Sequence, residues 1–478
     1  MSDVITLANQ IAAAKEDIRL AIEGRNVNVP ADTPFSEYAG KINLIASEVS
    51  TGDLYLKDPK YDDNTTSFTL PVKYSLIDHG ALAGKVNLQS VNVNNVIYVG
   101  DNAFSGDGSL TQFTGNNVKM IGSGAFAGCG FTSFSSSSVE TVGNGAFQSC
   151  SLTSLSLSKT VRLGVNVNSS NSALTSINLP EVTSIGSGAF ANCDNLTTLS
   201  LPKVEYVGSY CFNSIGSSAG STFTVSLPEL KVLGDNAFSN CTNLRSISMP
   251  KVERICAKAL NHSGSDAGKI TQLSVPMCTY IGSEAYRYYS SGNNEVRLDE
   301  LTIADGCEIH NGGAGEYMPV VVNGKVGSII CDKSSIGVWP IGVGSGNTST
   351  PSTIDLSGLT SIHWKNNSGM SIMSDYVYVS NGALDFQSLT DMSAEGTTSS
   401  NYFLNGPTYH TNVVKMWLNK NLVISPLGFG DSHFSIVNSS SVHIYTDAAS
   451  RPSSWPALSN ANWHFNCSHE DFENGIYN

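Results

Sequence analysis

Ile185–Cys193 reads IGSGAFANC, and variants of this stretch recur along the chain about every 22 residues. In this copy Ala-Phe begins three residues after the first glycine, and a cysteine stands seven residues after it. A fixed period of 20 to 29 residues predicts a solenoid, in which each repeat forms one rung of a stack. The marker glycines are Gly100, Gly122, Gly143, Gly164, Gly186, Gly208, Gly234 and Gly282, and Cys256 replaces the glycine in one further copy.

The first half of each repeat carries apolar residues at its first, fourth and sixth positions, as in Leu174–Pro180 (LTSINLP) and Leu196–Pro202 (LTTLSLP). This alternation predicts one short strand per rung, with the small polar residues facing outward. The Ala-Phe pair is expected to fill the interior of the opposite wall, because stacked rungs bury a continuous core. We therefore expect one parallel sheet over 110–276 that exposes Ser133, Ser154, Ser176, Thr198, Thr224, Ser246 and Gln272 and buries Ala125, Ala146, Ala189 and Ala237.

The combined pattern L-x-x-L-x-L-P-x-V-x-x-I-G-x-x-A-F-x-x-C resembles the BspA-like class of leucine-rich repeats. The resemblance is strong over 96–290, weak over 290–440, and returns at 442–465 as a segment similar to a terminal rung. It implies a β-rich repeat solenoid, coiled right-handedly, with a short parallel strand per rung. It also implies a surface that binds host cells, glycans or proteins and performs no chemistry.

The first 48 residues differ in kind, because apolar residues there follow helical spacing. One helix is expected over 3–24, ending at Gly24, and a shorter one is expected after Pro34. Narrow stripes of this kind need a partner, which is the other helix, a second copy of the chain or another protein. The candidate attachment or oligomerisation residues are Val4, Leu7, Ile11, Ile18, Phe35, Tyr38 and Ile42.

This segment is also similar to the leader of many bacteriophage tail-associated proteins, through Ile11–Ile22, Val27–Pro30 and Phe35–Ile42. That resemblance implies attachment to other virion tail proteins and assembly as a homo-oligomer. Four segments follow: a helical attachment segment (1–50), a β-prone connector and cap (51–95), a regular leucine-rich-repeat solenoid (96–305), and irregular β-rich repeats with a closing rung (306–478). Within the connector, Ser67–Val72 is predicted to be a strand and Ile77–Leu82 a degenerate first rung.

The composition excludes several classes of protein. Charged residues make up 14% of the chain and its formal net charge is −14, which argues against nucleic-acid binding. No apolar run is long enough for a membrane span, and the N-terminal residues lack the basic and apolar regions of a secretion signal. Several of the ten cysteines occupy one repeat position, so free buried thiols are expected rather than disulfides. These features fit a protein made in the cytoplasm of a host cell and incorporated into a phage tail.

The C-terminal part carries all five tryptophans and many tyrosines. Aromatic faces of this kind hold sugars or form interface hot spots, although the same residues also fill cores. The candidate binding residues are Trp364, Trp417, Tyr376, Tyr378 and Tyr409, whereas Trp455 and Trp463 are interpreted as core residues of the closing rung. Val320–Val326 contains Asn-Gly between two β-prone runs and predicts a hairpin.

The sequence gives little evidence for a metal site or a catalytic site. His464, Cys467 and His469 could contribute zinc ligands, but no second cluster completes a site, so no metal or cofactor is expected. Asp299, Glu300, Asp305 and Glu308 do not form a recognisable acid and base pair, so no catalytic residues are predicted.

We therefore predict a non-enzymatic phage tail fibre or tail-associated receptor-binding protein that contacts a host-cell glycan or protein through its repeats. The alternative is a bacterial surface or secreted leucine-rich-repeat adhesin, and the third interpretation is a polysaccharide depolymerase tail spike.

Overall fold

The structure is a computed structural model that describes residues 64–72, 74–218, 220, 222–263, 270–286, 288–289, 298, 300–311, 321–331, 353–364, 370–373, 383–394, 401–404, 415–424, 442–453, 455 and 461–474. The predicted N-terminal helices lie outside this set. The chain divides into two units, Met1–Val182 and Thr183–Asn478. The description below takes each unit by itself.

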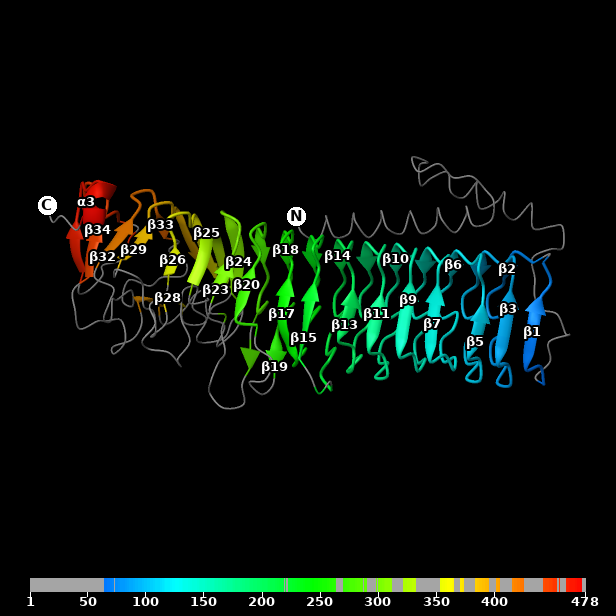
Figure 1. Ribbon diagram of the computed structural model, residues 1–478. Helices are drawn as coiled ribbons and strands as arrows, with labels where there is room; N and C mark the ends of the chain where they lie inside the picture. The colour runs from blue at the N-terminus through cyan, green and yellow to red at the C-terminus, as the bar shows by residue number, and fades with distance from the viewer. Residues whose placement is uncertain are drawn as a thin grey trace, which may run out of the picture. The chain divides into compact units, whose positions relative to one another are not determined.

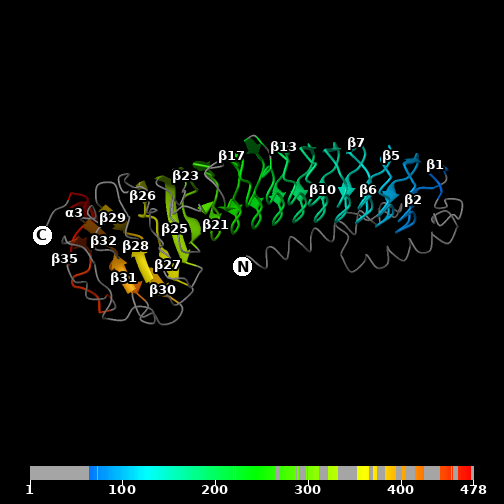
Figure 2. The ribbon, with the colours of Figure 1, turned by 90° about the horizontal axis from the view of Figure 1, so that it is seen from below.

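Unit 1 is a parallel β-solenoid in which each rung contributes a longer and a shorter strand. In both views the longer strands lie side by side along one wall and the shorter strands along another (Figures 1 and 2). The longer strands are β1 (Ser67–Leu70), β3 (Ser90–Val93), β5 (Gln112–Thr114), β7 (Ser133–Ser136), β9 (Ser154–Leu157) and β11 (Ser176–Asn178). The shorter strands are β2 (Leu76–Ile77), β4 (Tyr98–Val99), β6 (Met120–Ile121), β8 (Thr141–Val142) and β10 (Arg162–Leu163).

Equivalent residues of successive rungs pair in parallel. Ser154 of β9 lies opposite Ser133 of β7, and Ser176 of β11 lies opposite Ser154. The pairing of β2 with β4, together with the burial of Ile77 and Leu82, shows that residues 77–82 belong to the first rung, after β1. The expectation of one continuous sheet is wrong in detail, because β1, β3 and β5 form one hydrogen-bonded ladder and β7, β9 and β11 belong to another.

The repeated Ala-Phe pair forms the interior of unit 1. Ala125 and Ala146 are fully buried, which confirms the predicted register, and Ala189 and Ala237 of unit 2 are buried as well. The Phe126 ring stacks between Phe104, at a centroid distance of 5.4 Å, and Phe147, at 5.7 Å. The Phe126 ring therefore contacts the equivalent ring of the rungs before and after it, so the core is continuous across these three rungs.

The marker glycines let successive rungs approach each other closely. A β-carbon on Gly122 would lie 2.6 Å from the amide nitrogen of Asp101 and 2.7 Å from the carbonyl carbon of Gly100. These atoms belong to the backbone and cannot rotate away. Glycine therefore recurs at this position because of steric contact between rungs rather than because of an unusual backbone angle.

Unit 2 continues the same repeat. Its early longer strands are β13 (Thr198–Ser200), β15 (Phe223–Ser226), β17 (Leu244–Ser248), β20 (Gln272–Ser274) and β23 (Glu300–Thr302). Its short strands are β12 (Ser184–Ile185), β14 (Tyr206–Val207), β16 (Val232–Leu233), β18 (Arg254–Ile255) and β21 (Tyr280–Ile281), followed by β24 (Cys307–Asn311). β19 (His262–Ser263) pairs with β22 (Tyr288–Tyr289).

The later strands of unit 2 are also parallel but less regularly spaced. They are β25 (Val321–Cys331), β26 (Thr353–Asp355), β27 (Ser361–Trp364), β28 (Met370–Met373), β29 (Ala383–Phe386), β30 (Asp391–Ala394), β31 (Asn401–Leu404), β32 (Lys415–Leu418), β33 (Val423–Ile424), β34 (Val442–Tyr445) and β35 (Ala461–His464). The one helix in the part of the chain that the structure describes, α3 (His469–Asn474), follows β35.

The hairpin predicted at Val320–Val326 is wrong. β25 is a single strand of 11 residues that runs through Asn323 and Gly324. Its first residues pair in parallel with β23 and its last residues pair in parallel with β24. Gly324 has a φ of 107°, so the Asn-Gly pair bends the strand from one wall of the rung to the other. Pairing with the preceding rung outweighs the local turn preference of Asn-Gly.

Candidate functional site

The longer strands of unit 1 present an uncharged outer face, which we call the polar face. On each strand the alternate residues point inward, as shown by the burial of Phe134, Leu155 and Ile177. The residues between them are exposed or half-buried. The polar face consists of Ser67, Thr69, Ser90, Asn92, Gln112, Thr114, Ser133, Ser135, Ser154, Ser156, Ser176 and Asn178.

Every side chain of the polar face is a hydroxyl or an amide. Neighbouring strands of a sheet lie about 4.8 Å apart, and alternate residues of one strand lie roughly 6.6 Å apart. The face therefore offers a regular grid of groups that donate and accept hydrogen bonds. Because none of these groups titrates near neutral pH, the polar face offers hydrogen bonds without charge.

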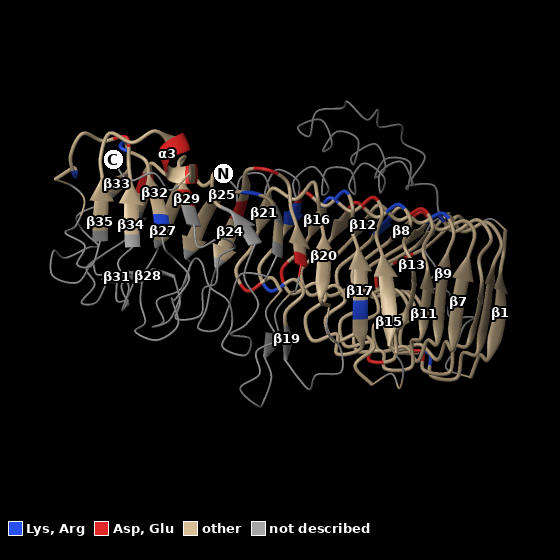
Figure 3. Cartoon of the chain, turned by 60° about the vertical axis from the view of Figure 1, so that its left-hand side comes forward, with Lys and Arg blue, Asp and Glu red and all other residues tan. Residues whose placement is uncertain are grey.

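Charged residues lie mostly in the turns between strands, whereas the strands β7, β9 and β11 contain none (Figure 3). Lys119 and Glu140, from consecutive rungs, form an ion pair of 2.6 Å. Exposed pairs of this kind contribute only about 0–1 kcal/mol each.

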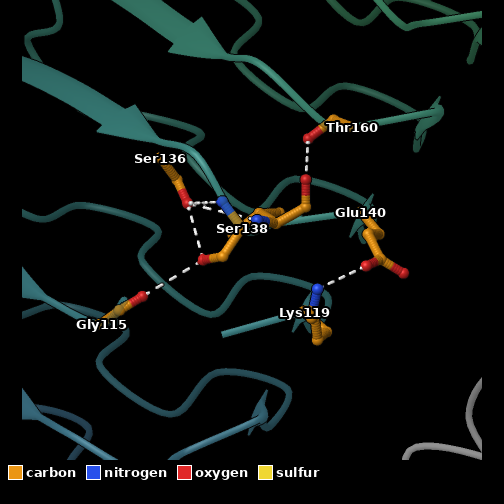
Figure 4. A network of polar contacts seen from close by, with 7 residues as sticks. Gly115, Lys119, Ser136, Ser138, Glu140 and Thr160 are labelled. Carbon is orange, nitrogen blue, oxygen red and sulfur yellow. Dashed lines mark hydrogen bonds and ion pairs between the residues drawn. The ribbon is translucent and has the colours of Figure 1, made fainter. Parts of the chain in front are cut away.

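Next to this ion pair, uncharged groups form a network of hydrogen bonds that connects neighbouring rungs (Figure 4). The Thr160 hydroxyl donates to the carbonyl of Val139 at 2.8 Å, one rung earlier. The Ser138 hydroxyl lies 3.5 Å from the carbonyl of Gly115 and 3.3 Å from the hydroxyl of Ser136. The network fixes the turn that follows β7, and so it holds the end of this strand of the polar face.

In unit 2 the outward residues of the first longer strands are also uncharged and polar, whereas a later strand carries a charged one. Thr224, Ser246 and Gln272 are exposed, as predicted, as is Thr198. Glu300 on β23, which lies opposite Gln272, interrupts the neutral pattern. Glu300 accepts a hydrogen bond of 3.4 Å from the Gln272 amide.

Of the candidate binding residues, Trp417 lies in an aromatic core. It is only 5% exposed and clusters with Tyr445, Cys467 and Phe472. Little of this ring is free for a ligand, because α3 covers the side of the sheet from which it projects. The backbone of Trp364 lies in β27, whereas its side chain, together with Tyr376, Tyr378 and Tyr409, lies outside the described residues.

Trp455 is a core residue, as predicted. It is 2% exposed, and its indole N–H donates to the carbonyl of Leu422 at 2.8 Å. Trp463, also predicted to be core, is only half-buried. The Lys415 ammonium group caps α3 by donating to the carbonyls of Phe472 at 2.6 Å and Glu473 at 2.8 Å. Ser468 and Asp471 cap the other end of the helix through reciprocal hydrogen bonds.

The possible zinc ligands are engaged separately. His464 lies 2.9 Å from His443, and burial together with the neighbouring His464 lowers the pKa of His443. Cys467 lies in the aromatic core, and His469 lies 2.8 Å from Asp385. Within the described ranges, no three His, Cys, Asp or Glu side chains converge in a way that could hold a metal ion.

Three of the four acidic residues considered for catalysis have local partners, and that of Glu300 is Gln272. Glu308 lies 2.6 Å from His310, and Asp305 accepts a hydrogen bond of 2.9 Å from the Lys325 amide. Asp299 lies outside the described residues, as do the candidate attachment residues Val4 to Ile42. No helix in the described part of the chain has the length and apolar character of a membrane span.

One buried acidic residue was not singled out from the sequence. Asp107 stands seven residues after Gly100, the position that Cys129 and Cys150 hold after their own marker glycines. Its side chain is fully buried, and burial raises its pKa from 3.8 to about 7. Comparing the repeats position by position would have revealed it.

The family comparison matches the repeats directly. Six copies of the model for the BspA type leucine rich repeat region match residues 60–163, 98–219 and 164–293. Residues 60–293 are a BspA-type leucine-rich repeat region. The match covers both the regular array and the first rung, which agrees with the resemblance seen in the sequence. It does not extend to the N-terminal segment that resembles phage tail proteins.

Several solved structures are similar to this chain. A leucine-rich repeat protein from Bacteroides ovatus is 17% identical, with a TM-score of 0.38, over 75% of this chain and 88% of that one. A leucine rich cell surface protein from Faecalibacterium prausnitzii is 15% identical, with a TM-score of 0.28, over 70% and 88%. The pneumococcal vaccine antigen PcpA is 12% identical, with a TM-score of 0.27, over 83% and 87%. No curated protein matches the chain.

Proposed function

We propose that this chain is a non-enzymatic bacterial surface or secreted protein that binds a neutral polar partner, a glycan or a protein, through its leucine-rich repeat region. The observation that carries the proposal is the polar face of unit 1, whose outward side chains are all hydroxyls or amides. Repeat solenoids commonly use extended surfaces of this kind for binding.

The BspA-type region also favours this location over a phage tail. Bacterial surface adhesins use this repeat class, whereas the resemblance to phage tail proteins is confined to the N-terminal leader. That leader lies outside the family match and outside the described residues. Antibodies against residues 96–305 provide the test: labelling of intact source cells or their culture medium supports the proposal, and labelling of purified phage particles overturns it.

Binding is tested with the fluorescently labelled full chain on an array of neutral, sulfated and sialylated glycans and on intact epithelial cells. A triple variant, Ser133→Glu, Ser154→Glu and Ser176→Glu, places carboxylates at the centre of the polar face. We expect at least a tenfold loss of binding with little change in thermal stability, because these positions are at least partly exposed.

The matched control adds the same charge elsewhere in unit 1. Gln148→Glu, Ser151→Glu and Val165→Glu change exposed residues that lie outside the strands. This control is expected to bind like the unaltered protein. Equal binding by both triple variants, or binding confined to sulfated and sialylated glycans, would rule out the polar face as the site.

A further inference from the structure

Two histidines connect β34 and β35 of unit 2 through their side chains. Nδ1 of His443, on β34, lies 2.9 Å from Nε2 of His464, on β35, and the planes of the two rings differ by only 17°. The distance between the two nitrogens is that of a hydrogen bond. This histidine pair adds to the backbone pairing of the two strands, in which Tyr445 lies opposite His464.

The histidine pair lies beside the aromatic cluster that α3 covers. The His464 ring lies 4.8 Å from the ring of Tyr445, and Tyr445 in turn contacts Phe472 of α3, with ring centroids 5.6 Å apart. The segment that joins β35 to α3 is also tied back to the preceding rung, because the Cys467 amide donates to the carbonyl of Thr446 at 3.1 Å. The position of α3 therefore depends on the pairing of β35 with β34.

Only one proton fits between the two facing nitrogens. While at least one ring is neutral, one of these nitrogens donates the hydrogen bond and the other accepts it. When both rings are protonated, both nitrogens carry a proton, so the hydrogen bond is lost and two positive charges face each other. Burial and the neighbouring His464 lower the pKa of His443, which agrees with this arrangement.

Several other charged groups lie on the elements packed here, and most of them have partners. Lys415 of β32, opposite His443, donates to carbonyl groups at the end of α3. His469 of α3 pairs with Asp385 of β29 at 2.8 Å and lies 3.5 Å from Glu473. The remaining titratable groups are Asp447, paired with Lys420 at 3.0 Å, Asp471, bonded to Ser468, the exposed Glu470, and Tyr445 and Cys467 in the aromatic cluster. Protonation of His469 strengthens its contacts with carboxylates, so it opposes the effect of the histidine pair.

We propose that the histidine pair is a pH-sensitive latch, which keeps β35 and α3 closed over the aromatic cluster at neutral pH and releases them in acid. An unfolded histidine binds its proton at about pH 6.5, whereas the folded pair resists the second proton. The contribution of the pair to stability is therefore complete above about pH 6.5 and is lost as the pH falls below that value. This inference does not depend on what the polar face of unit 1 binds.

The titration of the histidine pair is the first test. In the full-length protein the nine histidines are labelled with carbon-13 at Cε1 and followed by NMR, and His443→Asn and His464→Gln identify the two signals. We expect the pair to titrate in two separate steps, the second roughly one pH unit or more below the ordinary value of about 6.5. A single step near pH 6.5 for both rings would overturn the proposal.

Release of α3 is the second test, measured by hydrogen exchange with mass spectrometry at pH 7.5 and pH 5. The rates at each pH are divided by those of an unstructured peptide, because the intrinsic exchange rate itself depends on pH. Peptides from β35 and α3 should lose protection by roughly tenfold or more at pH 5, whereas peptides from β7 and β9 of unit 1 should lose none. Unchanged protection of α3 at pH 5 would contradict the proposed latch.

Variants separate the histidine pair from other acid effects. The double variant His443→Asn and His464→Gln places amide groups there, which can still hydrogen bond but do not titrate, so its α3 should stay protected at pH 5. His79→Asn makes the same change at a histidine of unit 1 whose side chain is 53% exposed, and it should keep the full acid response, as should His469→Gln. An acid response that persists in the folded double variant, or that His469→Gln abolishes, would rule out the pair as its source. If the double variant does not fold, the titration of the unaltered protein still decides the question.

Discussion

The backbone N–H of Lys85 donates a hydrogen bond of 2.6 Å to Oδ1 of Asp107, one rung later in unit 1. Oδ2 of the same carboxyl group is buried and has no hydrogen-bond partner. Oδ1 therefore has a hydrogen bond, whereas Oδ2 is shielded from water and gains no hydrogen bond in return. This burial disfavours the charged form of Asp107. In the later rung where Asn171 takes this position, the side-chain amide donates to the Leu152 carbonyl at 2.8 Å.

Asp107→Asn should make the stability of unit 1 less dependent on pH. Because burial raises the folded pKa from 3.8 to about 7, the folded state favours the protonated acid, and this share of stability is complete below about pH 4 and lost as the pH rises through about 7. At pH 8 the asparagine variant should be more stable than the original, by at most roughly 4 kcal/mol. Urea unfolding at pH 5 and pH 8 measures the difference.

Asp107→Cys is the companion variant, since the next two rungs carry cysteine at this position. A buried thiol is neutral at both pH values, so this variant should show the same flattened pH dependence. If both replacements keep the full pH dependence of the unaltered protein, Asp107 is not its source.

Phe126→Ala should strongly destabilise unit 1. The ring is fully buried and stacks on both Phe104 and Phe147, so its removal leaves a cavity that neighbouring rungs cannot fill. The expected loss is about 3–5 kcal/mol in the free energy of unfolding. Denaturant unfolding checks it, with Val161→Ala as the control because that side chain is 43% exposed. A loss no larger than that of the control would contradict the continuous core.

Gly122→Ala should destabilise the stack through a steric clash. The added methyl group would lie within 2.7 Å of the backbone of the preceding rung, which should cost about 1–3 kcal/mol. Gly108→Ala is the matched control, because a β-carbon there would meet only the carbonyl oxygen of Gly128, at 3.9 Å. Thermal melting of the two variants should show a clear loss for the first alone, and equal melting temperatures would refute the close-approach explanation.

Trp417→Ala should loosen the C-terminal rungs of unit 2. The indole packs against Phe472 of α3, with ring centroids 6.0 Å apart, and its loss should cost about 3–5 kcal/mol locally. Hydrogen exchange followed by mass spectrometry should show faster exchange in β32, β34 and α3. Val423→Ala, at a residue that is 58% exposed, should leave exchange unchanged. Normal protection together with weakened cell binding would instead revive the surface role of Trp417.

The repeat carries most of the information about fold. The spacing of Gly122, Ala125 and Phe126 is enough to predict stacked rungs, because one rung cannot bury its apolar residues alone and equal spacing brings like residues together. The same alternation predicts that Ser133, Ser154 and Ser176 face outward, since residues on a strand alternate between its two sides. These expectations needed no knowledge of contacts between distant residues.

Other features were decided only by tertiary structure. Asn323-Gly324 has the local chemistry of a hairpin turn, yet parallel pairing with the preceding rung draws it into one strand. Tryptophan is a residue type that is common at binding surfaces, yet the helix that follows β35 covers Trp417. Local sequence determines the backbone conformation that one rung favours. The burial and the pKa of a side chain depend instead on which residues of the next rung or of a later segment pack against it.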